Sequence, residues 1–144
     1  MYLLDSNVYI RGFNDPKFGE QLREFQTKYL PQIMLSIIVV HELLAGATTA
    51  AKERSLRHGL INPFKVRLRI PIPNQRTWEL AASVDRRLRL LKGFSASLDR
   101  RSFFNDILIA ATARDLGATI ITENRKDFAI IGRVLDIKFS LPWP

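Results

Sequence analysis

Residues 2–10 have the sequence YLLDSNVYI, a short apolar run that an acidic residue interrupts almost at once. Tyr2 to Leu4 predict a short buried β-strand, because they form a brief continuous apolar run. Asp5 and Ser6 follow directly, and both residue types commonly cap the first turn of a helix. The stretch therefore predicts a strand that leads straight into a helix. Whether Asp5 does more than cap that helix depends on which other side chains reach the same end of the strand.

Strand and helix patterns alternate along the rest of the chain. The segments with helical spacing of apolar residues are 18–29, 36–46, 74–93 and 102–116. The further short apolar runs that predict strands are 33–35, 118–122 and 134–137. Few hairpin signals separate them, so we expect an α/β fold with a mostly parallel central sheet and helices on both faces, in a Rossmann-like three-layer arrangement.

Residues 65–72, KVRLRIPI, alternate between basic and apolar side chains. Alternation with a period of two is typical of a half-buried strand. The segment therefore predicts a strand with one basic face, formed by Lys65, Arg67 and Arg69.

Length and composition limit the classes of protein. The chain has 144 residues, of which 47% are hydrophobic, so we expect a single domain over residues 1–144. The sequence contains no cysteine, which excludes a disulfide, a thiolate nucleophile and a zinc-thiolate site. No apolar run is long enough to cross a membrane and no leader pattern opens the chain, so we expect a cytoplasmic protein.

The net charge of +8 is concentrated in the middle of the sequence. Residues 52–101 contain 13 Lys and Arg residues but only 4 acidic ones. The polar face of the predicted helix 74–93 contributes Arg86, Arg87, Arg89 and Lys92. A clustered positive charge favours binding to a polyanion such as RNA, although an ordinary solvated basic surface has the same composition. With Lys65, Arg67 and Arg69, these residues are candidate RNA contacts.

Polar side chains follow three of the predicted strands. Asp5 follows the first and Ser36 the second, and Thr122 ends the strand ATIIT. In parallel sheets, ligands bind beyond the carboxyl ends of the strands, so these groups are expected to lie near one ligand site. The acidic and amide residues that come directly after Thr122 are Glu123, Asn124 and Asp127.

Two further acids occupy helix positions where apolar residues are expected. Asp106 shares a helical stripe with Phe103 and Ile109, and Glu42 lies beside Ile38 and Val39. A buried carboxylate is costly unless it is paired or binds a cation. Converging carboxylates repel one another, and oxygen ligands without Cys or His favour Mg²⁺ or Mn²⁺. Together with the basic middle section, such a pocket points to hydrolysis of phosphodiester bonds.

Four stretches of the sequence together resemble a known family. They are YLLDSNV (2–8), LSIIVVHELLAG (35–46), NDILIAATARDLGA (105–118) and IITENRKDF (120–128). In this order and spacing they resemble the four motif blocks of PIN-domain ribonucleases, in particular the VapC-type toxins of bacterial and archaeal toxin-antitoxin pairs. The resemblance implies a PIN-like fold over essentially the whole chain.

The resemblance also implies roles for individual residues. Asp5, Glu42 and Asp106 match the first three acidic positions of the family, and Asp5 and Asp106 are then the principal metal ligands. The fourth acidic position is Asn124 here, which leaves open whether Asn124, Glu123 or Asp127 completes the site. The resemblance assigns supporting hydroxyl groups, which orient carboxylates or water, to Ser6, Ser36 and Thr122.

The activity implied by the resemblance is that of an endoribonuclease that depends on Mg²⁺ or Mn²⁺. The implied partners are an RNA substrate, a VapB-like antitoxin and a second copy of the chain. A catalytically weak or inactive module that binds nucleic acid is the alternative, because Asn124 replaces an acid. A P-loop or dinucleotide-binding enzyme is disfavoured, because the sequence has no glycine-rich phosphate loop.

Overall fold

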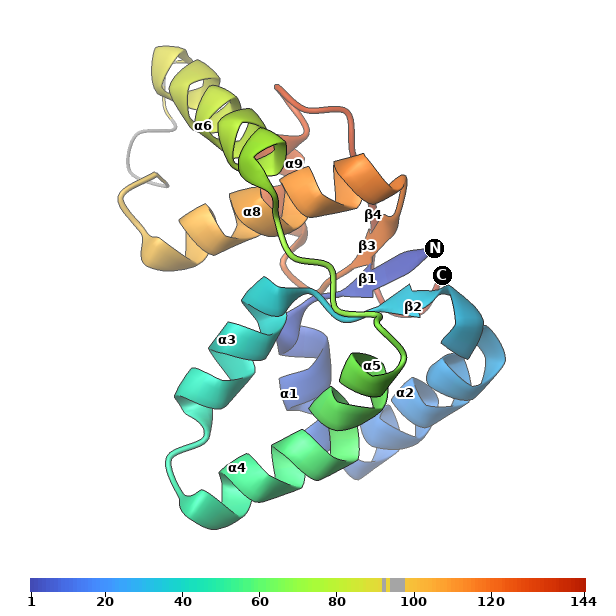
Figure 1. Ribbon diagram of the computed structural model, residues 1–144. Coiled ribbons are helices and arrows are strands. Elements are labelled where there is room, and N and C mark those ends of the chain that lie inside the picture. Colours follow the sequence, from blue (N-terminus) through green and yellow to red (C-terminus); the bar gives the residue numbers. More distant parts are fainter. Residues whose placement is uncertain (92, 94–97) are drawn as a thin grey trace.

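A four-stranded parallel sheet runs through the centre of the computed structural model, with the strand order β2-β1-β3-β4 (Figure 1). The structure describes residues 1–91, 93 and 98–144. Its strands are β1 (Tyr2–Leu4), β2 (Ile33–Met34), β3 (Thr119–Ile121) and β4 (Lys138–Ser140). β1 is a central strand, and Leu3 lies between Met34 of β2 and Ile120 of β3.

Helices make all the connections between these strands. The helices before β2 are α1 (Ser6–Asn14), α2 (Pro16–Tyr29) and the 3₁₀ turn η1 (Leu30–Gln32). Those between β2 and β3, among the residues that the structure describes, are α3 (Ile37–Gly46), α4 (Ala50–Leu56), the π-helical η2 (Arg57–Ile61), α5 (Asn62–Val66), α6 (Gln75–Leu90) and α8 (Arg101–Leu116). α9 (Arg125–Ile131) joins β3 to β4. No helix in the described ranges is both long and apolar enough to cross a lipid bilayer.

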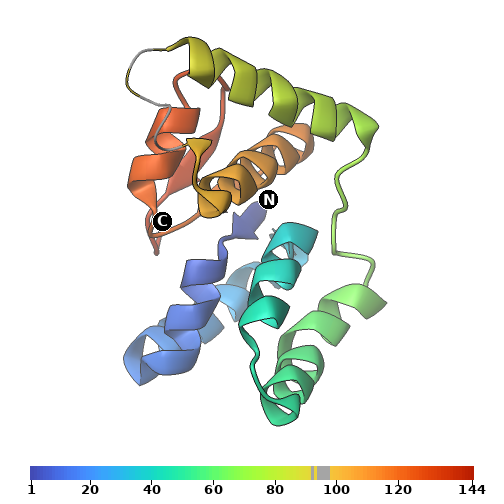
Figure 2. The same ribbon diagram turned by 90° about the vertical axis from the view of Figure 1, so that its left-hand side faces the viewer.

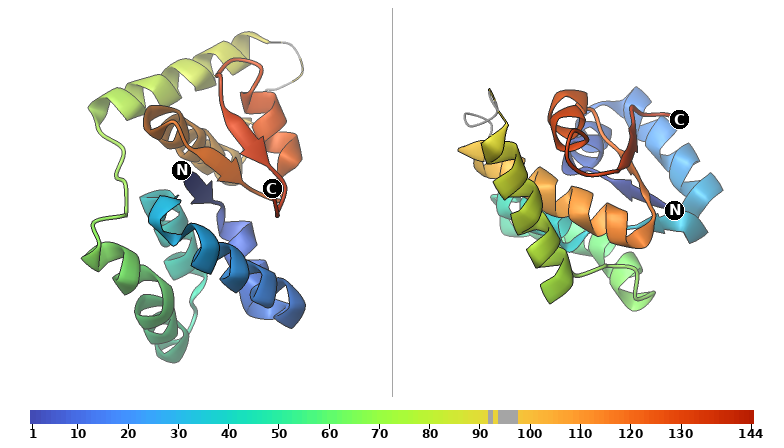
Figure 3. Two further views of the ribbon diagram at one scale, coloured as in Figure 1. Left: turned by 90° about the vertical axis from the view of Figure 1, so that its right-hand side faces the viewer. Right: turned by 90° about the horizontal axis from the view of Figure 1, so that it is seen from above.

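The strand order distributes the helices over two sides of the sheet. Right-handed crossovers place the β1–β2 connection on one face, and the β3–β4 connection together with the helices that lead into β3 on the other. Figures 1 and 2 show α6, α8 and α9 on one side and α1 and α2 on the other, with α3 to α5 beside them. The view from above in Figure 3 shows α6 lying across the outside of α8. The expected α/β fold with a parallel sheet is confirmed.

The core explains why the strands have continuous apolar sequences. Leu3, Leu4, Ile120 and Ile121 have no exposed surface, because helices cover both faces of the sheet. α8 is buried along most of its length, with every residue from 106 to 113 inside the protein. Gly117 ends α8 in the left-handed conformation at φ 63°, which favours glycine. Residue 106 is therefore held in the interior by the packing of the whole helix.

The prediction of a strand over residues 65–72 is wrong. The segment begins inside α5 and then turns, with Leu68 in the left-handed region at φ 55° and 90% exposed. Only the part after the turn forms backbone hydrogen bonds with the chain beyond β2: the carbonyls of Arg69 and Pro71 accept hydrogen bonds from the backbone of Leu35 and Ile37. The alternation of side chains therefore reflects an exposed turn whose apolar residues are not buried.

Two other boundaries differ from the sequence prediction. The last strand is β4 at Lys138–Ser140 rather than 134–137, because residues 133–135 form the turn that ends α9. α6 ends at Leu90 rather than at Gly93, and the backbone of its C-cap Leu91 is extended. Most of the segment between the predicted helices 74–93 and 102–116, residues 94–97, lies outside the described residues.

Candidate active site

Asp5 lies at the point where the chain leaves β1 and starts α1. Its Oδ1 accepts a hydrogen bond of 2.8 Å from the Ser6 backbone, so Asp5 does cap the helix. Its own backbone N–H donates to the carbonyl of Ile121 at the end of β3. β2 pairs with one edge of β1 and β3 pairs with the other edge, so the strand order reverses at β1 and Asp5 lies at a topological switch point.

The second carboxylate oxygen of Asp5 is held by side chains from two elements. Oδ2 accepts 2.7 Å from the Thr122 hydroxyl and 3.0 Å from the Asn7 amide. The Asn7 carbonyl in turn accepts 3.2 Å from the backbone of Glu123. Burial raises the pKa of Asp5, and the hydrogen bonds from Thr122, Ser6 and Asn7 oppose this rise. The carboxylate is thus fixed in one orientation but costly to ionise.

Asp106 lies in the second turn of α8 and is only 6% exposed. Burial raises its pKa to about 9, and the negative charges of Asp5, Asp127 and Glu42 add to the rise. Mutual repulsion of this kind requires that the carboxylates lie close together. The protein alone therefore leaves Asp106 protonated at neutral pH.

Asn124 and Asp127 complete the arrangement from the loop after β3 and the first turn of α9. The Asn124 amide nitrogen donates 3.0 Å to Asp106 Oδ2 and 2.8 Å to Asp127 Oδ2. The Asn124 backbone donates 2.9 Å to the Thr122 hydroxyl, which links this loop to Asp5. Asp127 is only 2% exposed, and its Oδ1 accepts 2.8 Å from Arg100 Nη2.

Glu42 approaches from α3 and is half-buried. Its Oε2 accepts 2.7 Å from the Ser6 hydroxyl, while its Oε1 is buried with no hydrogen-bond partner. Burial raises the pKa of Glu42, and the charge of Asp5 adds to this effect. Asp5, Glu42, Asp106 and Asp127 thus interact electrostatically, and we refer to these four residues as the acid cluster.

The PIN domain family model matches residues 2–134, which include every member of the acid cluster. The chain belongs to the PIN domain family. The predicted resemblance to PIN domains is therefore confirmed, and it covers nearly the whole chain. No curated protein matches this PIN domain closely enough to count as a relative.

Solved toxin-antitoxin complexes have the same fold. VapBC-1 from nontypeable Haemophilus influenzae matches with a TM-score of 0.68 and 25% identity, over 96% of each chain. A toxin-antitoxin complex from Klebsiella pneumoniae matches with a TM-score of 0.65 and 26% identity, over 90% of this PIN domain and 91% of that chain. DNA-bound VapBC from Salmonella typhimurium has a TM-score of 0.71 at 22% identity, over 97% and 96% of the two chains.

Several predicted site residues of this PIN domain lie apart from the acid cluster. Glu123 forms an ion pair with Arg11 of α1, whereas the side chain that bonds both Asp106 and Asp127 is that of Asn124. Ser36 caps α3, where its hydroxyl accepts 3.2 Å from the Ile38 backbone. Its predicted role as a supporting hydroxyl group stays a prediction.

The basic residues predicted to bind RNA are found on two other surfaces. Arg67 and Arg69 donate to the carbonyls of Pro63 and Leu30, and Lys65 is exposed on α5. On α6, Arg86 is exposed, Arg87 donates 2.6 Å to the Val134 carbonyl, and Arg89 forms a 2.8 Å ion pair with Asp85. Lys92, predicted on the same face, lies outside the described residues. The bonds of Arg67, Arg69, Arg87 and Arg89 are all to groups outside the acid cluster.

Two residues at the site did not emerge from the sequence. Asn7 was part of the first motif, and its spacing of two from Asp5 is a signal for an amide that holds the carboxylate. Arg100 precedes α8 in a run of surface charges, and nothing local distinguishes it from Arg101. Only the packing of α8 beside α9 brings Arg100 to Asp127.

The donor set of this PIN domain fits a divalent metal ion. Carboxylate oxygens are the ligands that Mg²⁺ and Mn²⁺ prefer, and the buried, unpartnered Oε1 of Glu42 is a free acceptor. Within the described ranges, no three acidic or His side chains already form a compact metal cluster. Burial raises the pKa values of Asp5, Glu42 and Asp106 and repulsion between the carboxylates adds to the rise, so a bound cation would favour their ionised forms.

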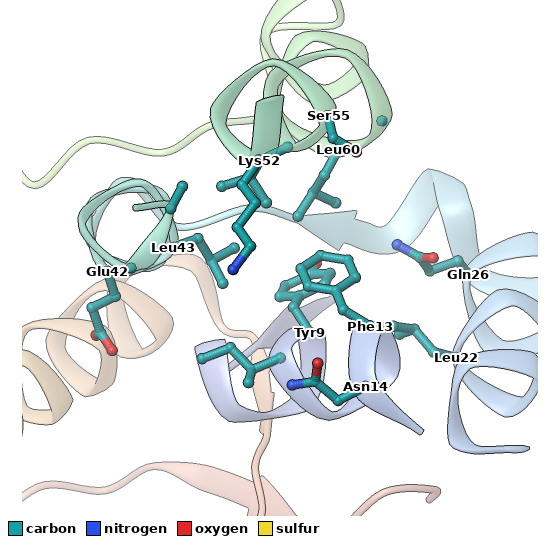
Figure 4. Close-up of a pocket in the computed structure, with 15 residues that line it drawn as sticks. Tyr9, Phe13, Asn14, Leu22, Gln26, Glu42, Leu43, Lys52, Ser55 and Leu60 are labelled. Carbon is teal, nitrogen blue, oxygen red and sulfur yellow. The ribbon is translucent and has the colours of Figure 1, made fainter. Parts of the chain in front are cut away.

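An apolar groove of about 570 Å³ opens beside the acid cluster, and Glu42 lies at its edge (Figure 4). Tyr9, Phe13, Leu43 and Leu60 contribute its walls, from α1, α3 and η2. The groove also has polar groups. Figure 4 shows the amino group of Lys52 extending into it, and the hydroxyl of the buried Tyr9 has no hydrogen-bond partner.

Proposed function

We propose that this PIN domain is an endoribonuclease that depends on Mg²⁺ or Mn²⁺ and acts as the toxin of a toxin-antitoxin pair. The observation that carries the proposal is the convergence of Asp5, Asp106 and Asp127, all buried, with Glu42 at one edge of the sheet. Arg100 pairs with Asp127, but among the ion pairs of the described residues none involves Asp5, Glu42 or Asp106, and three such acids close together destabilise a protein. Their convergence is explained if they hold a cation during catalysis.

Asp5 and Asp106 are the proposed principal metal ligands, and Glu42 supports them. Asp127 is the proposed fourth acid, because Asn124 links its carboxylate directly to that of Asp106 while Glu123 is engaged by Arg11. A divalent cation bound there acidifies a water molecule and offsets the charge that develops on the phosphate.

The protein's own groups set the geometry for this chemistry. Thr122 and Asn7 donate to the same oxygen of Asp5, so that carboxylate cannot rotate. The Ser6 hydroxyl directs one oxygen of Glu42 and leaves the other oxygen without a partner. Asn124 aligns Asp106 with Asp127. No side-chain nucleophile is required, since water is the attacking group.

The proposed protein partner is a VapB-like antitoxin. The matched structures include toxin-antitoxin complexes from Haemophilus influenzae and Klebsiella pneumoniae. The apolar groove beside Glu42 suits an apolar segment of such a partner, with an acidic group near Lys52. A partner bound there would lie next to the acid cluster and would block access of RNA to it. We also propose, by analogy with the family, that the chain forms a homodimer.

The experiment that tests the nuclease is cleavage of total cellular RNA by the purified protein in Mg²⁺ or Mn²⁺ and in EDTA. The matched variant is Asp106→Asn, which removes one charge and preserves shape. Discrete fragments that require the metal and vanish in the variant would support the nuclease. Salt-sensitive RNA binding without cleavage would contradict it and favour the inactive nucleic-acid-binding module.

A further inference from the structure

Arg100 is both anchored and exposed at the acid cluster. Its Nη2 donates 2.8 Å to Asp127, and its guanidinium carbon lies 5.8 Å from the ring centre of Phe103. The Arg100 side chain nevertheless remains 49% exposed, whereas that of Asp127 is 3% exposed. The guanidinium group thus contacts the buried carboxylate of Asp127, while about half of the Arg100 side chain is exposed to solvent.

The charge of the acid cluster creates a difficulty for an RNA substrate. RNA carries a negative charge at every phosphate, and the carboxylates of the cluster repel it. Arg100 lies within the field of the cluster, since Asp127 first and Asp106 also raise the pKa of its guanidinium. A positive group at this position offsets part of the repulsion where the phosphate must arrive.

The form of the side chain suits this task. A guanidinium group has five N–H donors in a rigid plane, and the bond to Asp127 uses one of its nitrogen atoms. The contact with Asp127 limits rotation, so that the exposed part of the plane keeps a constant direction. Arginine held in this way binds phosphate oxygens at a lower entropic cost than a free side chain.

The arginines on α6 are less suited to the same role. Arg87 donates to the Val134 carbonyl and Arg89 pairs with Asp85 on its own helix. α6 lies on the outside of α8 (Figure 3). These residues can add general attraction for RNA, whereas Arg100 alone among the three is joined to Asp127.

We propose that Arg100 binds an RNA phosphate at the mouth of the acid cluster, with Asp127 holding its guanidinium group in place. This inference rests on the proposed ribonuclease function and deepens it, because it assigns a substrate contact that the family resemblance does not supply.

The test is binding of a fluorescein-labelled single-stranded RNA oligonucleotide in EDTA, measured by anisotropy at several salt concentrations. Arg100→Ala is expected to weaken binding by about tenfold. It should also reduce the slope of log affinity against log salt by about 0.7, the value for one lost phosphate contact with single-stranded RNA. Arg100→Lys keeps the charge and should retain the slope.

Arg114→Ala is the matched control. Arg114 lies in the last turn of the same helix, and its side chain is 53% exposed and 3.8 Å from the exposed Asp136. Its loss should leave both affinity and slope unchanged. Equal affinity for Arg100→Ala and the wild-type protein would overturn the proposal, as would weaker binding with an unchanged slope.

Removal of Arg100 leaves the buried Asp127 unpaired, so Arg100→Ala alone can reduce folding. The double variant Arg100→Ala/Asp127→Asn avoids an unpaired charge, and its comparison with Asp127→Asn isolates the contribution of Arg100 to binding. Equal affinity of these two variants would also refute the phosphate contact.

The binding test separates this proposal from the nuclease itself. If the wild-type protein binds RNA through Arg100 but does not cleave it in Mg²⁺ or Mn²⁺, the nuclease fails and the phosphate contact stands. If the wild-type protein cleaves RNA and Arg100→Ala binds it equally well, the nuclease stands and the phosphate contact fails. If the wild-type protein neither binds nor cleaves RNA, both proposals fail.

Discussion

Asn124 presents its amide nitrogen, and not its oxygen, to Asp106, at a distance of 3.0 Å. The same nitrogen lies 2.8 Å from Asp127, so it bridges two carboxylates that would otherwise repel each other. A carboxylate accepts hydrogen bonds, so the donor side of the amide must face both acids. Asn124, at the position where the resemblance to PIN-domain ribonucleases implies an acid, therefore adds no negative charge and donates to two carboxylates of the cluster.

Asn124→Asp should destabilise the protein in EDTA by about 1–3 kcal/mol, because it replaces a donor with a further buried negative charge. Mg²⁺ should restore more stability to this variant than to the wild-type protein. Thermal unfolding with and without Mg²⁺ measures both effects. Gln32→Glu makes the same kind of amide-to-acid change at an exposed position of η1 and should alter neither value. Equal stability of Asn124→Asp and the wild-type protein in EDTA would contradict the bridging role.

Asp5→Asn and Asp106→Asn should each abolish metal-dependent RNA cleavage and leave a folded protein. Both substitutions preserve side-chain shape but remove a proposed ligand charge. Cleavage of a defined RNA and circular dichroism provide the two measurements. Asp136→Asn is the control, since the Asp136 side chain is 89% exposed and pairs with Arg114 rather than with a member of the acid cluster. Normal cleavage by both variants would rule out the proposed site.

The stability of the metal-free protein should depend on the protonation of Asp106. Its pKa is about 9 in the folded protein and 3.8 in the reference state, so the folded protein retains a proton that the unfolded chain loses. The stabilisation from this proton is complete below the lower pKa and is lost as the pH rises towards the higher one.

Asp106→Asn should remove this pH dependence. The free energy of unfolding of the wild-type protein should fall by about 1–3 kcal/mol more than that of Asp106→Asn when the pH is raised from about 6 to about 8 in EDTA. Urea unfolding at the two pH values measures the difference. A constant difference between the two proteins would mean that Asp106 is already ionised at neutral pH.

Thr122→Val should cost about 1–3 kcal/mol of stability, because Asp5 loses a donor at 2.7 Å and the Asn124 backbone loses its acceptor. Thr112→Val is the control, because the buried Thr112 hydroxyl bonds only the Leu108 carbonyl of its own helix. Chemical denaturation of both variants in EDTA makes the comparison. A loss no larger for Thr122→Val than for Thr112→Val would show that Thr122 does not support Asp5.

Leu68→Gly should stabilise the protein by about 0.5–1 kcal/mol, because Leu68 has φ 55° and is 90% exposed. Glycine adopts this conformation without steric strain, and little burial is lost. Val66→Gly, at an exposed position within α5, should instead destabilise the protein. Thermal unfolding of the two variants should therefore give shifts of opposite sign.

Much of the fold was predictable because β1 and β3 at its centre are short apolar runs that are mostly buried. β1 and β3 are found where continuous apolar runs predicted them, and Ser36 and Asn74 cap helices as expected. The segment 65–72 was misassigned because alternation is a local pattern. It does not reveal that Leu68 lies on a solvent-exposed turn.

The sequence also predicted that acids from separate strands and helices would meet, since Asp106 and Glu42 occupy apolar stripes. It left the fourth acid open, because Glu123 and Asp127 lie on the same short loop and helix start. In the structure Glu123 pairs with Arg11, whereas Asn124 donates to Asp127, and these contacts support the proposal that Asp127 is the fourth acid. The position of Arg100 depends on how α8 packs beside α9, which no local pattern encodes.

The central position of β1 also affects how the protein folds. Tyr2 pairs with Thr119, so the chain must close a very long loop before these two strands can join. Contacts between residues so distant in sequence form slowly, because closing the loop reduces the conformational entropy of the chain before the contacts can stabilise it. Asp5 meets Thr122 only when this pairing is complete. A chain in which β1 has not yet joined β3 therefore lacks the assembled acid cluster, and the proposed catalysis would require this pairing.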